Sequence, residues 1–540
     1  MKNRIRQSAL TWSKFDLGFI TLAIVVVAVT RWLYHATYLF HWDSVQFALG
    51  MQGMDILHHR PHPPGYVFYV WLGNLAKLFT HDDNLALILV GILATIVGVL
   101  IIYLFARSLF RHRLPAVLAV LFFIFNTSVW FHGIVAEVYI VESVIALVAI
   151  WRLYLYWKIP SWRNLVLAIG LLGLVGGFRQ TTELALIPLA IFVLWQTGTN
   201  FKRWLIAAGV LLLSNLTWLV PILINTGGIG AYWHGLATLS DVVIGQYYRS
   251  RGFFVHAVNN LNLVGEALSV AVVAELIVLM LASALYLIRG TAKQYQIIWP
   301  QVWFWLLAIG GQLVLTITIL MTNPGYVLLP VILIGLLSAG GIWQLMLALQ
   351  PVSLRLAQIW AIGGTVIIIG SQVFNFYVLK PEQFAFVNPA LPSVTRHDEL
   401  LDEIVQTIRN NSVGKSVAVW INVPNTIIFF GFRHMQYYLP DLNIYRGLPE
   451  SLVHPEDKTV WHAKGPNYEV YEDKVYIADS TERLFTLRDT WDALHKQYEI
   501  PITMPDGHTL VYYDLTDSAT RDYLSTNYNF VFLKDAETQI

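Results

Sequence analysis

The 540-residue sequence contains no cysteine, which excludes disulfides, thiolate metal sites and cysteine nucleophiles. Charged residues are also scarce, at 13% of the chain against about 25% in an ordinary globular protein. The net charge is only +1 and no basic stripe is present, so no nucleic-acid partner is expected. Apolar residues make up 56% of the chain. This composition is typical of a protein that crosses a membrane several times.

The acidic residues are unevenly placed along the chain. Residues 1–378 contain 11 of them and residues 379–540 contain 23. This change predicts a membrane domain over 1–378 and a soluble domain over 379–540. In the soluble part, helix-like patterns (399–410 and 425–438) alternate with strand-like patterns (417–423, 475–478 and 509–513). A small α/β or α+β fold is therefore expected there.

A helix that crosses a membrane needs about 20 mostly apolar residues. Eleven stretches meet or approach this length, near 16–36, 85–106, 114–130, 136–157, 162–178, 183–199, 204–224, 266–288, 300–321, 326–348 and 357–378. The first stretch follows a basic N-terminal segment, residues 1–14. No small-residue cleavage site is apparent there, which indicates an uncleaved helix rather than a signal peptide. The sequence thus predicts a polytopic α-helical membrane protein with about eleven transmembrane helices.

The distribution of Lys and Arg predicts the orientation of these helices. With a cytoplasmic N-terminus, 15 of the 21 basic residues before residue 379 fall in inner loops, as expected for a multi-pass membrane protein. An odd number of spans then makes the C-terminal domain extracytoplasmic, and we favour a bacterial or archaeal cell membrane over the endoplasmic reticulum. Two outer segments, 34–83 and 225–265, are long. The first is expected to contain a helix over 43–57 and a helix lying at the membrane interface over 66–79.

The densest group of residues able to carry chemistry lies in the first outer segment. It reads His41-Trp42-Asp43-Ser44 and, further on, His58-His59-Arg60-Pro61-His62-Pro63-Pro64-Gly65-Tyr66. A carboxylate beside Arg and His fits a reaction that deprotonates a hydroxyl and stabilises a phosphate leaving group. A structural interpretation is also open, in which Asp43 is a helix N-cap and the prolines form a turn.

A second group lies at the expected outer mouth of the fourth span. Glu137, in Ala136-Glu137-Val138-Tyr139, is either a helix-start carboxylate or a second acid facing an outer cavity, and its membrane setting favours the cavity. Arg179 opposes the positive-inside trend, so it is either paired with a carboxylate such as Glu183 or reserved for a phosphate. Three other residues are expected to be structural: Glu275, His112 and His132.

These motifs resemble a family signature. Asp43-Ser44, His62-Pro63-Pro64-Gly65-Tyr66 and Ala136-Glu137-Val138-Tyr139 resemble a branch of the glycosyltransferase C superfamily, formerly a domain of unknown function, that is related to protein O-mannosyltransferases. The resemblance covers about residues 15–185 and is only architectural beyond them. It implies a membrane enzyme that moves a sugar from a polyprenyl-phosphate carrier to an acceptor at the outer face, with Asp43 as the catalytic carboxylate.

The sequence departs from this family pattern at one place. The family commonly has an acidic residue shortly after Asp-Ser, whereas Val45 and Gln46 follow here. A second acid would then have to come from Asp55 or Glu137. The soluble domain also lacks the Trp-Trp-Asp motif of the oligosaccharyltransferase branch, which argues against transfer of a whole oligosaccharide to asparagine.

The resulting hypothesis is an inverting glycosyltransferase that uses a polyprenyl-phosphate-linked sugar and contacts membrane lipid. The expected roles are general base for Asp43 with Glu137 as a second acid, donor phosphate binding for Arg60, His62 and Arg179, and substrate orientation for Tyr66, Tyr139 and Asp55. The acceptor, whether protein, lipid or glycan, is left open. The chemistry requires no metal cofactor, although a divalent cation is compatible with it.

Two other classes of function compete with this hypothesis. A transporter or flippase for lipid or glycan would typically show inverted repeats or broken helices, and neither is apparent in the sequence. A lipid-linked glycan ligase or polymerase would rely on Arg and His rather than on a carboxylate base. Replacement of Asp43 discriminates the transferase from the ligase, and a transport assay in vesicles tests the transporter.

Overall fold

The computed structural model describes residues 12–241, 245–289, 292–379, 389–421, 431–446, 460–464, 468–472, 474–487, 497–505, 507–528 and 530–534. Its contacts divide the chain into two units. The membrane unit contains residues Met1–His35 and Pro63–Ser393, and the C-terminal unit contains Ala36–His62 and Val394–Ile540. The predicted division at residue 378 is close to this second boundary. It differs for residues 36–62, which group with the C-terminal unit although they lie between two membrane helices in sequence.

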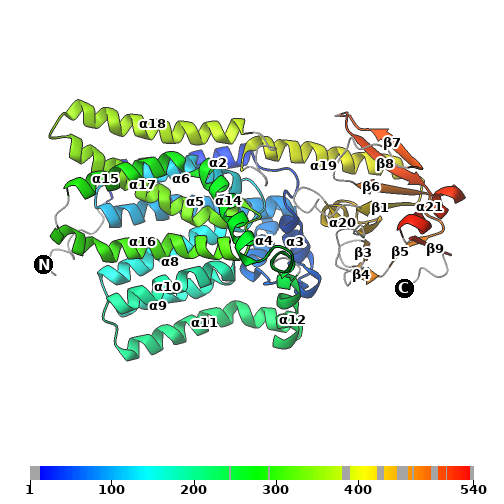
Figure 1. Cartoon of the computed structure of the whole chain (residues 1–540), viewed down its shortest axis with the longest axis horizontal. Helices are drawn as coiled ribbons and strands as arrows, with labels where there is room; N and C mark the ends of the chain where they lie inside the picture. The colour runs from blue at the N-terminus through cyan, green and yellow to red at the C-terminus, as the bar shows by residue number, and fades with distance from the viewer. Residues whose placement is uncertain are drawn as a thin grey trace. The chain divides into compact units, whose positions relative to one another are not determined.

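The membrane unit is helical throughout its described residues, and Figure 1 shows its long helices lying side by side. Its elements are α2 (Lys14–Leu33), α4 (Val67–Thr80), α5 (Asp83–Phe110), α6 (Arg113–Phe125), α7 (Thr127–His132), α8 (Tyr139–Lys158), α9 (Trp162–Val175), α10 (Gln180–Gln196), α11 (Phe201–Thr226), α12 (Ile229–Ser240), α13 (Gln246–Arg251), α14 (Phe253–Ala271), α15 (Val273–Arg289), α16 (Ala292–Thr318), η3 (Pro324–Val327), α17 (Leu328–Leu349) and α18 (Leu354–Val378).

The predicted spanning stretches all lie on helices, which confirms a polytopic α-helical membrane protein. Seven helices of the described residues are long and apolar enough to cross a membrane, or eight if the bent pair of α14 and α15 counts as one span. The three remaining stretches are the shorter helices α6, α9 and α10. A total of about eleven crossings therefore stays a prediction that depends on these three.

The predicted eighth span is wrong in one respect, because it is not a continuous helix. The axes of α14 and α15 differ by 88° across a break at Val272, so the expectation of unbroken helices is also wrong. The carbonyl oxygen of Ala271 at the break accepts hydrogen bonds from Asn126 at 2.8 Å and from Gln372 at 2.7 Å. These side chains satisfy a backbone group that the helix no longer bonds, as a break at membrane depth requires.

Two residues expected to be structural have such roles. Glu275, in α15, is fully buried, and its Oε1 lies 3.5 Å from the Gln372 amide. His112 is the N-cap of α6, and its Nδ1 accepts a hydrogen bond from the backbone N–H of Leu114 at 3.2 Å. These observations give neither residue a part in the candidate chemistry.

The C-terminal unit combines helices with a mixed sheet, which confirms the predicted mixture of helices and strands. Its elements are α3 (Trp42–Gln52), η1 (Ile56–His58), α19 (Leu391–Ser412), β1 (Val417–Ile421), α20 (Phe432–Tyr438), β2 (Asn443–Arg446), β3 (Val460–Lys464), β4 (Tyr468–Glu472), β5 (Val475–Ala478), β6 (Arg483–Leu487), β7 (Glu499–Thr503), β8 (Thr509–Asp514), α21 (Ser518–Tyr528) and β9 (Phe530–Leu533). The expected helix over 425–438 is observed as α20, and residues 425–430 lie outside the described residues.

Seven of these strands form one sheet in the order β4-β3-β2-β1-β6-β8-β7, and β5 pairs with β9 in parallel in a second sheet. In the large sheet β1 is parallel to both neighbours, β2 and β6, whereas the outer pairs are antiparallel. All five residues of β1 are buried, as expected for a central parallel strand covered on both faces.

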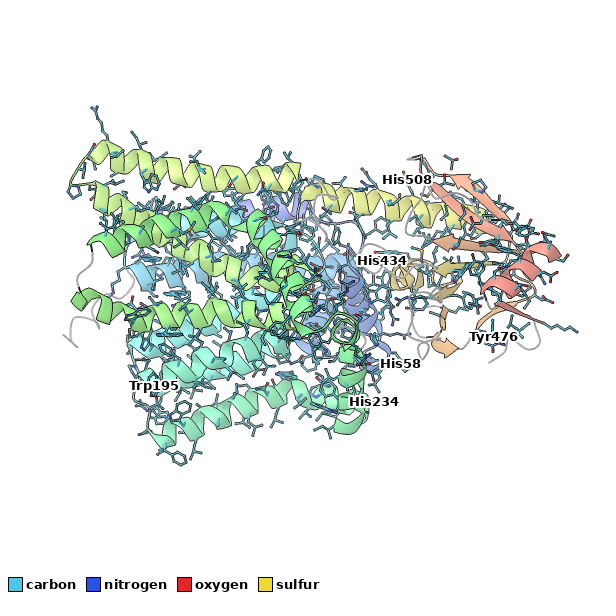
Figure 2. All side chains as sticks on the ribbon, viewed as in Figure 1. His58, Trp195, His234, His434, Tyr476 and His508 are labelled. Carbon is cyan, nitrogen blue, oxygen red and sulfur yellow. The ribbon has the colours of Figure 1, made fainter. Side chains whose placement is uncertain are left out.

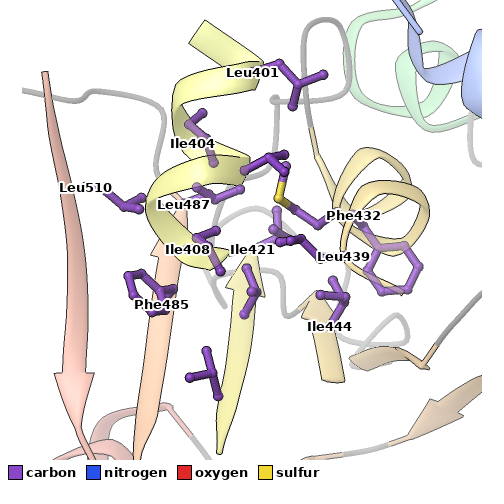
Figure 3. Close-up of a cluster of buried hydrophobic side chains, with 14 of the residues drawn as sticks. Leu401, Ile404, Ile408, Ile421, Phe432, Leu439, Ile444, Phe485, Leu487 and Leu510 are labelled. Atoms are coloured by element: carbon purple, nitrogen blue, oxygen red, sulfur yellow. The ribbon is translucent and has the colours of Figure 1, made fainter. Parts of the chain in front are cut away.

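Helix α19 packs its apolar side chains on one face of this sheet (Figure 3). Leu401, Ile404 and Ile408 recur at helical spacing and form a core with Ile421 of β1 and Phe432 of α20. Trp42, from the segment that grouped unexpectedly with this unit, belongs to the same core and is 8% exposed. The candidate catalytic segment is therefore built into the C-terminal unit through its hydrophobic core.

Candidate functional site

Asp43 lies in the first turn of α3, which runs from Trp42 to Gln52, whereas a helix was expected over 43–57. The N-cap is His41, so the interpretation of Asp43 as a helix cap is wrong. The Nδ1 atom of His41 accepts a hydrogen bond from the backbone N–H of Asp43 at 3.2 Å, and the Ser44 hydroxyl accepts one from the His41 N–H, also at 3.2 Å. This reciprocal cap leaves the Asp43 carboxylate outside the capping hydrogen bonds.

The Asp43 carboxylate has two histidines beside it. Its Oδ1 lies 3.6 Å from Nδ1 of His62, and its Oδ2 lies 3.8 Å from Nδ1 of His41. The contact with His41 is not an ion pair, because that Nδ1 already accepts the backbone N–H and carries no proton in this arrangement. The Asp43 side chain is 22% exposed, so an incoming group can reach it.

His62 is held by the residue at which the sequence departs from the family pattern. Its Nδ1 makes a short contact with Oε1 of Gln46. Since that oxygen can only accept, the His62 Nδ1 carries the proton and donates it. His41, Asp43, Gln46 and His62, here called the Asp43 cluster, thus place an amide where the family commonly has an acid.

Asp55 and Arg60 close a turn in the same unit. Their backbones form two hydrogen bonds of 2.8 Å, and the Asp55 carboxylate accepts from Nδ1 of His58 at 2.7 Å. Asp55 is also the N-cap of η1, and the Arg60 residue is buried at 5% exposure. Both residues therefore have clear structural roles, and their expected roles in substrate binding stay predictions.

Glu137 lies in the membrane unit, in the turn between α7 and α8. Helix α8 begins at Tyr139 with Val138 as its N-cap, so the interpretation of Glu137 as a helix-start carboxylate is wrong. Its carboxylate is buried and engages Nδ1 of His132 at 2.8 Å and the Asn323 amide at 2.8 Å. His132, which was expected to be structural, is thus the buried hydrogen-bonding partner of Glu137.

Arg179 is paired with a carboxylate, but not with the one proposed from the sequence. Its Nη1 lies 3.4 Å from Oε1 of Glu142, which also accepts from the Thr182 hydroxyl at 3.4 Å. Glu183 instead accepts a hydrogen bond from Asn215 of α11 at 2.8 Å. Arg179 and Glu142 are both buried, so each needs the other as a countercharge.

The loop that contains η3 joins these two pairs into one network. The guanidinium carbon of Arg179 lies 4.0 Å from the ring centre of Tyr326 and 5.1 Å from that of Tyr139, within the range of cation–π attraction. The two tyrosine rings are 5.6 Å apart. Gly325 lies so close to the Tyr139 ring that an added Cβ would be 2.3 Å from it.

We call this set the membrane network: His132, Glu137, Tyr139, Glu142, Arg179, Asn323 and Tyr326. Sequence reasoning missed Asn323 and Tyr326. The signal available for them is Asn323-Pro324-Gly325, a typical turn sequence placed between two apolar helices, with the Asn323 side chain accepting from the Gly325 N–H at 2.8 Å.

Tyr66 begins helix α4, which spans Val67–Thr80 and matches the helix expected over 66–79. Its backbone adopts φ of 43° in the left-handed region, which is uncommon for a bulky residue. The adjacent Pro64 carbonyl accepts hydrogen bonds from the Tyr232 hydroxyl at 3.2 Å and the Gln180 amide at 3.4 Å. This motif is therefore fixed to α10 and α12, while the expected contact of Tyr66 with substrate stays a prediction.

Among the residues that the structure describes, no group of three or more His, Asp or Glu side chains is arranged to hold a metal ion. The carboxylates of the membrane network are each engaged by nitrogen donors, as the pairs above show.

Residues 61–222 match the family model for dolichyl-phosphate-mannose-protein mannosyltransferases. The family resemblance seen in the motifs is thus confirmed over this stretch. The matched stretch includes His62, Glu137 and Arg179, whereas Asp43 lies outside it. This part of the chain is related to membrane glycosyltransferases, and no curated protein sequence matches the chain significantly.

Three solved structures of similar proteins have low sequence identity to the chain. ArnT from Cupriavidus metallidurans in the apo state is 12% identical, with 81% of this chain and 94% of that chain covered and a TM-score of 0.46. ArnT from the same organism bound to undecaprenyl phosphate is also 12% identical, with coverage of 82% and 94% and a TM-score of 0.38. The Archaeoglobus fulgidus oligosaccharyltransferase in complex with Zn and sulfate is 14% identical, with coverage of 75% and 60% and a TM-score of 0.44.

Proposed function

We propose that this protein is an inverting glycosyltransferase that moves a sugar from a polyprenyl-phosphate donor to an acceptor hydroxyl at the outer face of the membrane, with Asp43 as the general base. The observation that carries the proposal is the setting of Asp43. Its carboxylate is reachable, stands outside the helix cap and has the N–H-bearing His62 imidazole 3.6 Å away. A general base must be accessible to the hydroxyl that it deprotonates, and a neighbouring N–H group can fix its orientation.

The proposed reaction is a single displacement. The acceptor hydroxyl gives its proton to Asp43 while its oxygen forms a bond to the anomeric carbon. The bond between that carbon and the phosphate oxygen breaks, and its electron pair leaves with the polyprenyl phosphate. Attack on the face opposite the leaving group inverts the anomeric carbon. The leaving phosphate needs charge stabilisation rather than a proton, so cationic groups and N–H donors suffice.

The proposed phosphate ligands are His62, Arg60 and Arg179. His62 is proposed to donate to the phosphate from Nε2 as an imidazolium, because its Nδ1 proton is already donated to Gln46. Arg179 faces Glu142 with one terminal nitrogen and has further N–H donors for a phosphate. Glu137, with two hydrogen-bonding partners, is proposed to hold the membrane network in shape rather than to move a proton.

The donor class is supported by the family match, whose description names a sugar linked to dolichyl phosphate. The sugar and the acceptor are left open, as Tyr66, Tyr139 and Asp55 are proposed only to orient the substrate. The reaction as written needs no metal, and added divalent cation is one variable of the test. We further propose that the N-terminus is cytoplasmic and the C-terminal unit extracytoplasmic, in a bacterial or archaeal cell membrane, from the distribution of Lys and Arg.

The deciding experiment measures release of free polyprenyl phosphate by the purified protein in detergent. Polyprenyl-phosphate-linked mannose, glucose, galactose and arabinose are supplied with a cell extract as acceptor source, with and without divalent cation. Release that disappears in Asp43→Asn and persists in Asp479→Asn, at a carboxylate paired with Arg521 in the same unit, supports the proposal. Release unaffected by Asp43→Asn would refute the proposed base.

The break between α14 and α15 is the one feature that favours a transporter or flippase, because broken helices are common in such proteins. Its open carbonyl is satisfied by Asn126 and Gln372, which is consistent with a closed structural break. Reconstitution in vesicles tests this alternative. Movement of a polyprenyl-linked sugar across the bilayer without chemical transfer would favour it.

A further inference from the structure

Several residues that precede Asp43 in the segment 36–62 are hydrogen-bonded to the C-terminal domain. The backbone N–H groups of Thr37 and Tyr38 donate to the two carboxylate oxygens of Asp398, at 2.5 and 3.3 Å. The Tyr38 hydroxyl makes a short hydrogen bond to Asp402. Both aspartates lie on α19, so this helix holds the beginning of the segment through side-chain oxygen acceptors.

Helix α20 holds the next residues. The Leu39 N–H donates to the Tyr438 hydroxyl at 2.8 Å, and the Leu39 carbonyl accepts from Nε2 of His434 at 2.9 Å. His434, labelled in Figure 2, is fully buried. Burial lowers the pKa of its imidazole well below the ordinary value of 6.5, and the nearby His397 lowers it further. A neutral imidazole with its proton on Nε2 therefore donates to the segment.

Trp42, directly before Asp43, anchors the segment in the hydrophobic core of the C-terminal unit. Its ring faces two guanidinium groups, that of Arg446 at 5.4 Å and that of Arg433 at 6.0 Å. Arg433 also donates to the backbone carbonyl of His58 at 3.1 Å, so it contacts the segment at the first residue of α3 and again beyond the end of this helix. Burial, and to a lesser degree the charge of Arg433, lower the pKa of Arg446 to about 10.

From these contacts we infer that the C-terminal domain is a positioning element of the transferase reaction, which holds Asp43 in place by docking residues 37–58 on α19 and α20. The inference rests on the proposed role of Asp43 and deepens it. A loop that needed only to connect two helices would not require two buried arginines, a buried histidine and a core tryptophan. A displacement of about 1 Å in a catalytic group can cost about a hundred-fold in rate, so such anchoring matches the demands of a base.

The first test uses the full-length protein with Arg433→Met and Asp398→Ala. The controls are Arg521→Met and Asp479→Ala, which break an ion pair of 2.5 Å elsewhere in the same domain. We expect faster hydrogen exchange in peptides covering residues 36–62, a fall in kcat of up to about a hundred-fold and an unchanged KM for the donor. Arg433→Lys, which keeps a cation and a donor, should recover part of the lost kcat. The controls should leave both the exchange and kcat unchanged.

Unchanged hydrogen exchange in residues 36–62 of the variants would overturn the docking. Faster hydrogen exchange there with a normal kcat would overturn the positioning role. Exchange in β1 and β6 checks that the domain remains folded. The proposed function fails separately, since full turnover by Asp43→Asn would remove the base whatever the exchange measurement shows.

The absence of cysteine permits a second, independent test. The double variant Thr37→Cys with Asp398→Cys loses the two hydrogen bonds that the Asp398 carboxylate accepts. We therefore expect a lower kcat in its reduced form. Oxidation should join the two residues, because the Thr37 backbone nitrogen lies 2.5 Å from the Asp398 carboxylate. If docking positions Asp43, the disulfide raises kcat towards that of the native protein. A disulfide that forms and abolishes turnover would overturn the inference, because the segment would then have to leave the domain during the reaction.

Discussion

The Asp43 cluster and the membrane network contain the same kinds of side chain in opposite settings. The Asp43 carboxylate is 22% exposed and its histidine neighbours stand 3.6 and 3.8 Å away. Glu137 and Glu142 are 1% and 2% exposed, and nitrogen donors approach them to 2.8 and 3.4 Å. A carboxylate that is both buried and engaged is poorly suited to exchange protons with a substrate. The comparison therefore supports the proposal that Asp43 transfers the proton, and it favours a structural role for the buried carboxylates of the membrane network.

The two groups also differ in how they are held. The membrane network is internally bonded, with residues of α7, α8, α10 and the η3 loop each contacting another member. The Asp43 cluster depends on residues outside itself, because its segment is anchored by α19 and α20. Variants in the network are therefore expected to change stability first, whereas variants in the cluster are expected to change rate first.

The largest expected effect is that of Asp43→Asn. Loss of a general base typically lowers the rate by about 10²–10⁴-fold, and the amide keeps the shape of the side chain. The measurement is release of polyprenyl phosphate by the variant and the native protein at equal amounts of folded protein. Asp479→Asn is the matched control, because Asp479 pairs with Arg521 elsewhere in the same unit and we expect little loss of rate. A similar loss in both variants would contradict the distinction drawn between these carboxylates.

The next largest effect is on stability, in Arg179→Met. This change leaves the buried Glu142 carboxylate without its countercharge, which typically costs about 3–5 kcal/mol. We expect a lower thermal unfolding temperature in detergent. The double variant Arg179→Met with Glu142→Leu should recover most of the lost unfolding temperature, because neither charge is then buried alone.

Donor binding separates the two roles of Arg179. If Arg179 binds phosphate, the stable double variant should still have a raised KM for the donor. A normal KM would restrict Arg179 to structure.

A smaller effect is expected from Gly325→Ala. The added Cβ would lie 2.3 Å from the Tyr139 ring, so the ring that packs beside Arg179 must shift. Overpacking of this kind typically costs about 1–3 kcal/mol. Thermal unfolding measures the cost, and Gly310→Ala is the control. Gly310 lies in α16 with nothing within 4 Å of an added Cβ, and the change there should be neutral or stabilising. Equal effects at both positions would show that the contact between Gly325 and Tyr139 is unimportant.

The sequence predicted the helices well because length and hydropathy are local properties. Each apolar stretch lies on a helix, and α4 starts within one residue of its expected position. The break at Val272 was missed, since no Pro or Gly marks it and the stretch 266–288 is apolar on both sides. The partners that repair the break, Asn126 and Gln372, are distant in sequence.

The candidate site was harder to predict for the same reason. Glu183 was the natural partner for Arg179 because it lies one helical turn away, but α8 brings Glu142 to the guanidinium instead. Asn323 and Tyr326 reach Glu137 and Arg179 only through the packing of the η3 loop. The membership of residues 36–62 in the C-terminal unit likewise depends on contacts with residues more than 300 positions away, such as that of Thr37 with Asp398. A single sequence contains no direct signal for such pairs.

The smallest expected effect is a pH dependence that arises from His434. Its folded-state pKa is lowered well below 6.5 by burial and by His397 and His41. Above about pH 6.5 the imidazole is neutral in both the folded and unfolded states. As the pH falls below that value, the unfolded imidazole takes up a proton that the folded one does not, so the free energy of unfolding decreases.

Two quantities are therefore expected to fall between pH 7.5 and 5.5. One is the thermal unfolding temperature of the C-terminal unit, and the other is the hydrogen-exchange protection of residues 36–62 after correction for the intrinsic exchange rate. His434→Gln, which can still donate to the Leu39 carbonyl, should weaken this dependence, whereas His508→Gln at a less buried position in the same unit should keep it. If His434→Gln leaves the pH dependence intact, the buried imidazole is not its source, and the docking of the Asp43 segment must be sensitive to pH through another group.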